Sequence, residues 1–235
     1  MKLSGRVFSF PIRRLRSQYL TRKVTERGPH GRVIVDDPFI PVTLKVDEGA
    51  KFVLRGRLRV YSYLGSRESV FIHLKRGSSL VVDGDFELGG GCKIVLEPDA
   101  ELYIGGRRRE EVSGMTERSR ILVRRRIHIG ADFMCSWGVY VTDSDWHDVV
   151  GRQNTEDTVI GDHVWVAPNC SLLKGTRIGG ESIVATGAVT HRTSFPAGSL
   201  IGGLPARVLA SNRSWNREDQ VSAARLGDSA ARAMG

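Results

Sequence analysis

Residues 160–190 read IGDHVWVAPNCSLLKGTRIGGESIVATGAVT, and an apolar residue stands at nearly every sixth position. These positions hold Ile160, Val166, Leu172, Ile178, Val184 and Thr190, and only Thr190 is polar. An amphipathic helix repeats about every 3.6 residues and a half-buried strand about every two, so neither explains this period. A coil of short flat faces that turns at regular corners does explain it. The stretch therefore predicts a solenoid.

The same period extends toward the N-terminus in three further runs. They are Ile40, Val46, Phe52, Leu58 and Leu64; then Leu74, Leu80, Phe86, Cys92, Pro98 and Ile104; then Ile121, Ile127, Phe133 and Val139. Small residues two positions before several members suit the crowded inside of a corner, as at Cys170, Thr176, Ser182 and Ala188. The register breaks at 65–73, 105–120 and 145–159, where we expect loops to leave the solenoid and 105–120 to be mobile.

This hexad pattern resembles the hexapeptide-repeat family. The resemblance implies a left-handed parallel β-helix of triangular cross-section with three hexads per coil, and about seven coils would fit in this chain. The left hand comes from the resemblance alone, because parallel crossovers are otherwise right-handed. We therefore expect an all-β fold with short helical segments at its ends.

The ends of a solenoid need covers, and both termini suit that task. We expect a basic N-terminal arm or helix over 1–35, the β-helix over 36–209, and a C-terminal helix over 210–235. Residues 11–24 open with Pro11 and mix Leu15 and Tyr19 with several arginines, as in a short amphipathic helix. That helix would either cap the first coil or contact a membrane surface.

The composition narrows the class of protein. Lys and Arg number 35 against 26 Asp and Glu, and the net charge of +9 favours anionic partners. Neither zinc-finger spacing nor an RNP-like aromatic motif is present, so we expect no nucleic acid partner. Three cysteines without CxxC spacing argue against a disulfide framework. The chain shows no signal peptide, and we expect a cytoplasmic protein.

Residues 159–209 closely resemble the C-terminal coils of sugar and polysaccharide O-acetyltransferases within this family. The resemblance rests on IGDHVW at 160–165, KGTRIG at 174–179, VATGAV at 184–189 and GGLPARVL at 202–209. It implies direct transfer of an acyl group from acetyl-CoA, or another acyl-CoA, to a hydroxyl of a sugar or polysaccharide precursor. It also implies a homotrimer with active sites between chains. The first half of the chain shows only the repeat.

The segment DSDWHD at 143–148 resembles the catalytic segment of these enzymes. The resemblance makes His147 the general base, since a neutral imidazole can take the proton of an attacking hydroxyl. Asp143 or Asp145 would orient the ring or bind the acceptor. Trp146 would form an apolar platform for a sugar ring, or only pack the loop down.

The resemblance also assigns residues to coenzyme A. Trp165, Ala167 and Pro168 match the positions beside the thioester, and Thr186 and Gly187 match the next coil. Arg192 and Arg207 match positions where basic residues meet the nucleotide phosphates, to which a guanidinium is well suited. Corner packing would explain the small residues equally well. The family usually has Gly where Ala167 stands, which puts the route of the pantetheine arm in doubt.

Other functions stay open at this point. The other histidines are expected mostly at the surface: His30, His73, His128, His163 and His191. Carbonic anhydrases of similar fold bind zinc through three histidines, but the stretch VAPNCSLL lacks the histidines that such a site needs, so we expect no metal. Two alternatives remain, an N-acyltransferase for a nucleotide-linked amino sugar and a solenoid scaffold without catalysis.

Overall fold

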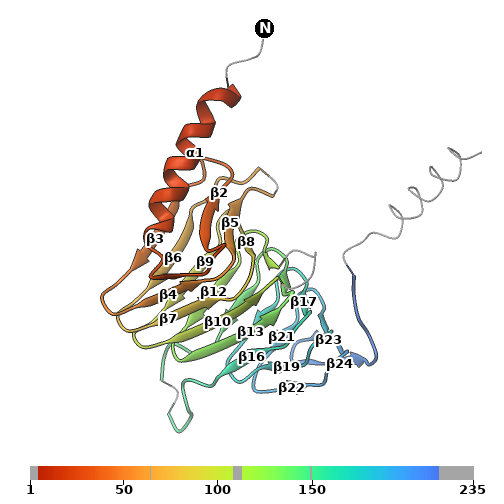
Figure 1. The fold of residues 1–235 in the computed structure, drawn as a ribbon. Helices are drawn as coiled ribbons and strands as arrows, with labels where there is room; N and C mark the ends of the chain where they lie inside the picture. Colours follow the sequence, from red (N-terminus) through yellow and green to blue (C-terminus); the bar gives the residue numbers. More distant parts are fainter. Residues whose placement is uncertain (1–4, 64, 108–112, 149, 217–235) are drawn as a thin grey trace, which may run out of the picture.

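The computed structural model describes residues 5–63, 65–107, 113–148 and 150–216. Its strands form three sheets that the chain visits in turn, so that each circuit adds one strand to each sheet (Figure 1). Sheet A contains β1 (Glu26–Arg27), β4 (Lys51–Leu54), β7 (Ser79–Val82), β10 (Glu101–Gly106), β13 (Arg126–Ala131), β16 (Thr158–Ile160), β19 (Arg177–Ile178) and β22 (Ser194–Phe195).

Sheets B and C complete each coil. Sheet B contains β2 (Arg32–Val35), β5 (Arg57–Tyr61), β8 (Phe86–Gly89), β11 (Gly114–Met115), β14 (Met134–Cys135), β17 (Trp165–Val166), β20 (Ile183–Val184), β23 (Leu200–Gly203) and β24 (Ala206–Ala210). Sheet C contains β3 (Val42–Val46), β6 (Val70–Leu74), β9 (Lys93–Leu96), β12 (Arg120–Val123), β15 (Tyr140–Thr142), β18 (Ser171–Leu172) and β21 (Val189–Thr190). The seven strands of sheet C confirm the expected seven coils.

The fold is the expected all-β, left-handed parallel β-helix. Strands pair in parallel with the coils above and below, as in Ile160 with Ile178 and Val166 with Val184. Both pairs are 18 residues apart, which is three hexads. The six hexad residues from Ile160 to Thr190 are all buried, and so are the small residues at Cys170, Thr176, Ser182 and Ala188.

The hexad register is looser in the first half of the chain. Pro98 is exposed, contrary to its expected place in the core, because it lies in a turn beside Asp99, whose φ is 60°. The early coils are longer than three hexads, and Phe52 pairs with Leu80, which is 28 residues later. Most of the predicted hexad residues in these coils are buried, but burial also alternates along strands of four to six residues, so the period of six describes only part of the core.

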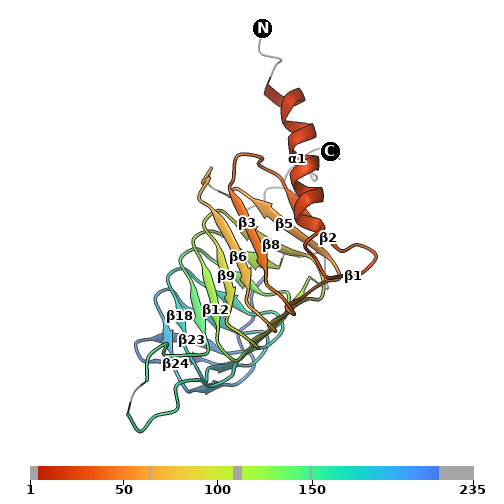
Figure 2. The same cartoon turned by 90° about the vertical axis from the view of Figure 1, so that its left-hand side faces the viewer.

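The N-terminal cover is a single helix, α1 (Gly5–Thr21), that projects from the end of the solenoid (Figures 1 and 2). Its C-terminal half packs on β2, where Thr21 Oγ1 accepts a hydrogen bond from the Val33 amide at 3.0 Å and Leu20 is buried. Pro11 lies inside the helix and does not open it as expected. No helix among the described residues is long and apolar enough to cross a lipid bilayer.

The ends of the solenoid differ from the predicted boundaries. β1 and β2 already belong to sheets A and B, so the solenoid begins before residue 36. At the other end β24 turns back on β23 as an antiparallel strand and extends to Ala210. The predicted C-terminal helix falls mostly on 217–235, which lie outside the described residues.

The predicted loops are shorter than expected, with one exception. β6 already begins at Val70, and within 105–120 the chain returns to the solenoid to form β11. Between β15 and β16, however, the chain leaves the solenoid over residues 143–157 and projects beyond the sheets (Figure 2). This excursion carries the predicted catalytic segment.

Candidate active site

The excursion at 143–157, here called the histidine loop, is a hairpin at the corner between sheets C and A. Ser144 and Thr155 form an antiparallel bridge, and the Asp145 amide donates to the Asn154 carbonyl at 3.1 Å. The Ser144 hydroxyl also donates to the Asn154 side chain at 2.8 Å. These bonds tie the two arms of the hairpin together near its base.

Asp143 begins the loop and is fully buried. Its carboxylate accepts the backbone N–H groups of Arg124, Arg125 and Arg126 at 2.8, 2.7 and 2.7 Å. Burial raises the pKa of the Asp143 carboxyl, and the three backbone hydrogen bonds oppose that shift. Both oxygens are used to hold the turn between β12 and β13. The structure thus gives Asp143 a structural task and does not direct it to an acceptor or to His147.

Asp145 forms an ion pair with Lys174, a residue that the sequence analysis did not single out. The Lys174 side chain is only 1% exposed, and its Nζ also donates to the Gln153 carbonyl at 2.6 Å. A buried ammonium group needs such partners, because the transfer of an unpaired charge from water into the protein interior costs much free energy. Lys174 therefore braces the histidine loop from the next coil of the solenoid.

Arg192 braces the same loop from one coil further. Its Nε donates to Glu156 Oε2 at 2.8 Å, and its Nη2 donates to the Gln153 carbonyl at 3.0 Å. The family resemblance grouped Arg192 with Arg207 at the nucleotide end of coenzyme A. The structure separates the two, since Arg207 is on β24, the last strand of sheet B.

Trp146 and His147 stand beyond the braced base of the loop. Trp146 has a φ of 66°, and its Nε1 donates to the Tyr140 hydroxyl at 2.9 Å, which pins the indole to β15. His147 is exposed, and its imidazole makes no hydrogen bond to any described residue. An available imidazole on an anchored backbone is the arrangement that a general base needs.

The residues matched to coenzyme A lie along the corner between sheets B and C. Ala167 and Pro168 follow β17, and Thr186 and Gly187 follow β20 directly beneath. The Gly187 amide donates to the Pro168 carbonyl at 3.0 Å, and Gly187 has a φ of 72° with open space around its Cα. The backbone of this corner is thus accessible, and Gly suits a positive φ.

Trp165 points outward from sheet B and is covered in part by the chain's last described residues. Its Nε1 lies 3.3 Å from the Ser136 hydroxyl, and its ring centroid lies 6.2 Å from that of Trp215. Trp215 stacks on His163 at 4.3 Å between centroids. His163 is buried, not at the surface as expected, because Trp215 folds back over it from 52 residues away.

The two groups of predicted site residues therefore lie at different corners of one chain. The histidine loop and Arg192 are at the corner of sheets C and A, whereas Ala167, Pro168 and Gly187 are at the corner of sheets B and C. A single chain does not bring them together. Within the described residues no group of three or more His, Cys, Asp or Glu side chains could hold a metal ion.

The cysteines are not prepared for nucleophilic chemistry. Cys92, Cys135 and Cys170 are free and buried. Burial raises the pKa of the Cys92 thiol to about 12 and also raises the pKa of the other two. A thiolate would therefore be scarce near neutral pH.

Residues 157–192 match the family model described as bacterial transferase hexapeptide (six repeats). The chain is 30% identical over 104 residues to the polysialic acid O-acetyltransferase of Neisseria meningitidis. The aligned region covers 42% of this chain and 48% of the relative. It is 28% identical over 85 residues to a 2,3,4,5-tetrahydropyridine-2,6-dicarboxylate N-acetyltransferase of Staphylococcus aureus. That aligned region covers 36% of this chain and 30% of the relative.

Among solved structures, that of a polysialic acid O-acetyltransferase matches with a TM-score of 0.49 and 19% identity, over 83% of this chain and 92% of the other. The present chain spans half or less of the length of the curated relatives named above. The family match thus falls on residues 157–192, within the part of the three-sheet β-helix whose hexads stack 18 residues apart, and there the chain is similar to bacterial hexapeptide transferases.

Proposed function

We propose that this protein transfers an acetyl group from acetyl-CoA to a hydroxyl of a sugar or polysaccharide precursor, with His147 as the general base. The observation that carries the proposal is the histidine loop. It presents an exposed imidazole without a hydrogen-bond partner among the described residues, on a hairpin braced by Lys174 and Arg192. A merely solvated loop would not require a lysine that is 1% exposed at its base.

The reaction needs one proton acceptor and no covalent intermediate on the protein. The imidazole of His147 takes the proton of the acceptor hydroxyl while that oxygen attacks the thioester carbonyl. A backbone N–H at a coil corner stabilises the resulting oxyanion. The tetrahedral intermediate then collapses, the C–S bond breaks, and the departing thiolate of coenzyme A receives the proton from the imidazolium. Acetyl ester and free coenzyme A are the products.

The donor would lie along the corner formed by Pro168 and Gly187. The accessible backbone there can bond the amides of the pantetheine arm, and the small residues permit a close approach. Arg207 is exposed on β24 and its guanidinium has no ion pair with a described residue, so it can meet a phosphate. Arg192 is assigned to the histidine loop, because its guanidinium is already bonded there.

The active site would form between two copies of the chain in a homotrimer. Within a single chain, His147 and the corner formed by Pro168 and Gly187 lie apart. A neighbouring copy can place its own Pro168–Gly187 corner against His147 of the first chain. Cyclic symmetry would repeat this cleft three times. The histidine loop is held within its own chain, so the partner would complete the site and need not support the loop.

The similarity to a polysialic acid O-acetyltransferase supports a glycan hydroxyl as acceptor. The Staphylococcus relative is named as an N-acetyltransferase, which keeps an amine acceptor as the second candidate. Three free cysteines and an acetyl-CoA donor also fit a reducing cytoplasm.

The proposal is tested by coenzyme A release from acetyl-CoA with a panel of neutral sugars, sialic acids, amino sugars and nucleotide-linked amino sugars. We expect turnover with a hydroxyl acceptor and an ester product, which mild alkali removes. An alkali-stable amide product would assign the enzyme to amines instead. The absence of turnover on the whole panel, above slow hydrolysis of acetyl-CoA, would favour the scaffold.

A further inference from the structure

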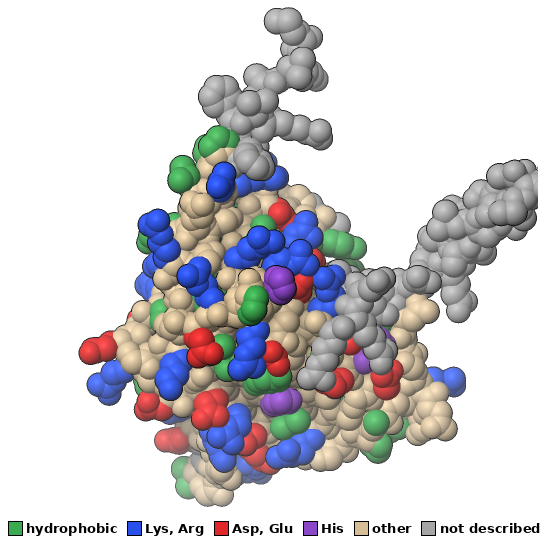
Figure 3. All heavy atoms as spheres, in the orientation of Figure 1, with side chains coloured by type: hydrophobic (Ala, Val, Ile, Leu, Met, Phe, Trp, Pro, Cys, Tyr) green, Lys and Arg blue, Asp and Glu red, His purple; other side chains and the backbone are tan. Residues whose placement is uncertain are grey.

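The positive charge of the protein is concentrated at its N-terminus. The first 25 residues contain seven of the 35 Lys and Arg residues and none of the 26 acidic ones, which leaves 28 basic and 26 acidic residues for the rest of the chain. The solenoid is therefore close to neutral, and nearly all of the net charge belongs to α1 and its flanks. In Figure 3, Lys and Arg side chains gather around the end of the molecule that carries α1.

A groove between α1 and β2 collects two of these basic side chains and two further arginines that follow them in the sequence. Its volume is about 840 Å³, and Arg14, Arg22, Arg27 and Arg32 line it. All four are exposed, and none forms a hydrogen bond or an ion pair through its side chain with a described residue. We call these four residues the arginine groove. Their guanidinium groups are therefore available to an anion from outside the described chain.

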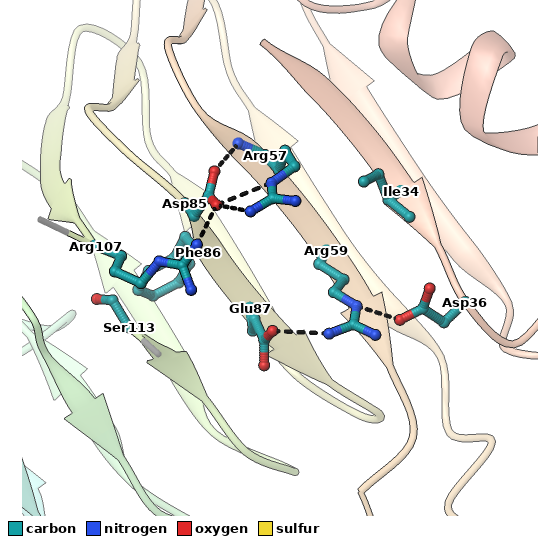
Figure 4. A pocket seen from close by; sticks show the side chains of 9 residues that line it. All are labelled: Ile34, Asp36, Arg57, Arg59, Asp85, Phe86, Glu87, Arg107 and Ser113. Atoms are coloured by element: carbon teal, nitrogen blue, oxygen red, sulfur yellow. Dashed lines mark hydrogen bonds and ion pairs between the residues drawn. The ribbon is translucent and has the colours of Figure 1, made fainter. Parts of the chain in front are cut away.

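The arginines of the neighbouring hollow form a contrast. Arg57 and Arg107 both bond the Asp85 carboxylate, with Arg57 Nε and Arg107 Nη2 each 2.9 Å from Oδ2 (Figure 4). Arg59 is paired with Asp36 and Glu87. This hollow of about 440 Å³ neutralises its own charge. The arginine groove, which adjoins it at Ile34, does not.

The same helix exposes an apolar stripe. Ile12, Leu15 and Tyr19 are 49%, 66% and 60% exposed and follow the i, i+3, i+7 spacing of one helix face. The opposite face is the one that packs on the solenoid, through Leu20 and Thr21. Large apolar side chains aligned on a helix that is already anchored indicate a second contact surface.

We propose that α1 docks on a lipid bilayer that contains anionic headgroups. The apolar stripe enters the boundary between headgroups and acyl chains, and the arginine groove receives lipid phosphates beside it. Both features are what an interfacial helix requires. A second copy of the chain would bring like charges together, and a soluble polyanion would leave the apolar stripe in water.

This docking would also orient the enzyme. α1 covers the first coil, whereas the histidine loop follows β15 and the proposed donor corner follows β17 and β20. The helix would hold the opposite end of the solenoid away from the bilayer, so the proposed active site would stay open to water.

The test is sedimentation of the full-length protein with vesicles, without donor or acceptor, so its outcome is independent of the proposed catalysis. We expect strong binding to phosphatidylcholine vesicles that contain phosphatidylglycerol and weak binding to phosphatidylcholine alone. Leu15→Ser should lower the partition coefficient about tenfold, by loss of apolar burial. The double variant Arg14→Gln/Arg22→Gln should lower it about 30-fold, and added salt should reproduce that loss.

Matched controls come from the other end of the solenoid. Leu209→Ser and Arg177→Gln remove an exposed apolar and an exposed basic side chain there, and both should bind vesicles like the parent. Unchanged circular dichroism and melting temperature would show that the α1 variants fold. Equal binding to both kinds of vesicle would overturn the proposal. Vesicle binding that needs the arginines but not Leu15 would overturn the proposal in favour of a soluble polyanion. A lower molecular mass of the protein in solution for Leu15→Ser alone, without a loss of vesicle binding, would overturn it in favour of a second copy of the chain.

Discussion

Asp143 shows how one buried side chain can support a site without taking part in its chemistry. Its carboxylate holds three consecutive backbone N–H groups of the previous coil, at Arg124, Arg125 and Arg126. We expect Asp143→Ala to lower the free energy of unfolding by roughly 2–4 kcal/mol, because these donors would lose their acceptor. Urea denaturation measures the change. A loss below about 0.5 kcal/mol would mean that water replaces the carboxylate without cost.

The raised pKa of the Asp143 carboxyl adds a dependence on pH. A carboxyl whose pKa is higher in the folded than in the unfolded chain favours folding at low pH. Its contribution is fully present below the unfolded pKa of about 3.9 and is lost as pH rises through the folded pKa. Asp143→Asn should lack this pH-dependent contribution to stability, because an amide does not titrate in this range. The stability of the parent relative to that variant should therefore fall as pH is raised from about 3, and a relative gain would contradict the sign.

At the scale of elements, the regular second half of the solenoid was predictable and the supports of the site were not. Hexads of constant length predict the register of β16 to β21, because each coil repeats after three hexads. Longer early coils break that rule, as Pro98 demonstrates. The excursion carrying His147 was visible as a break in the register. Its anchors were not, because Lys174 and Arg192 bond the loop across 21 to 39 residues without any local pattern.

The edge strand β24 carries the proposed phosphate contact at Arg207. We expect Arg207→Ala to raise the KM for acetyl-CoA about tenfold and to change kcat less than twofold, because this contact is remote from the reacting atoms. Steady-state kinetics with varied donor measure both constants. Arg213→Ala, which removes another exposed arginine at the same end, is the matched control. An unchanged donor KM would return Arg207 to a purely structural role.

At the scale of the whole molecule, the separation of the two corners implies assembly. Light scattering coupled to size exclusion should give a mass of about three times 26.0 kDa. Mixing His147→Ala chains with Trp165→Ala chains should partly restore activity, because some clefts then combine an intact loop with an intact donor corner. An active species with the mass of one chain would contradict the trimer. Proven exchange of chains without recovery would put both residues in the same chain's site.

The proposed role of the His147 imidazole is to remove the proton of the acceptor hydroxyl. It is tested most directly by kcat for acetyl transfer in His147→Ala, with His30→Ala as the control for loss of an exposed histidine elsewhere. We expect a fall in kcat of about 100-fold or more for His147→Ala, an unchanged melting temperature, and parental activity for His30→Ala. A kcat/KM of His147→Ala within about threefold of the parent would contradict it.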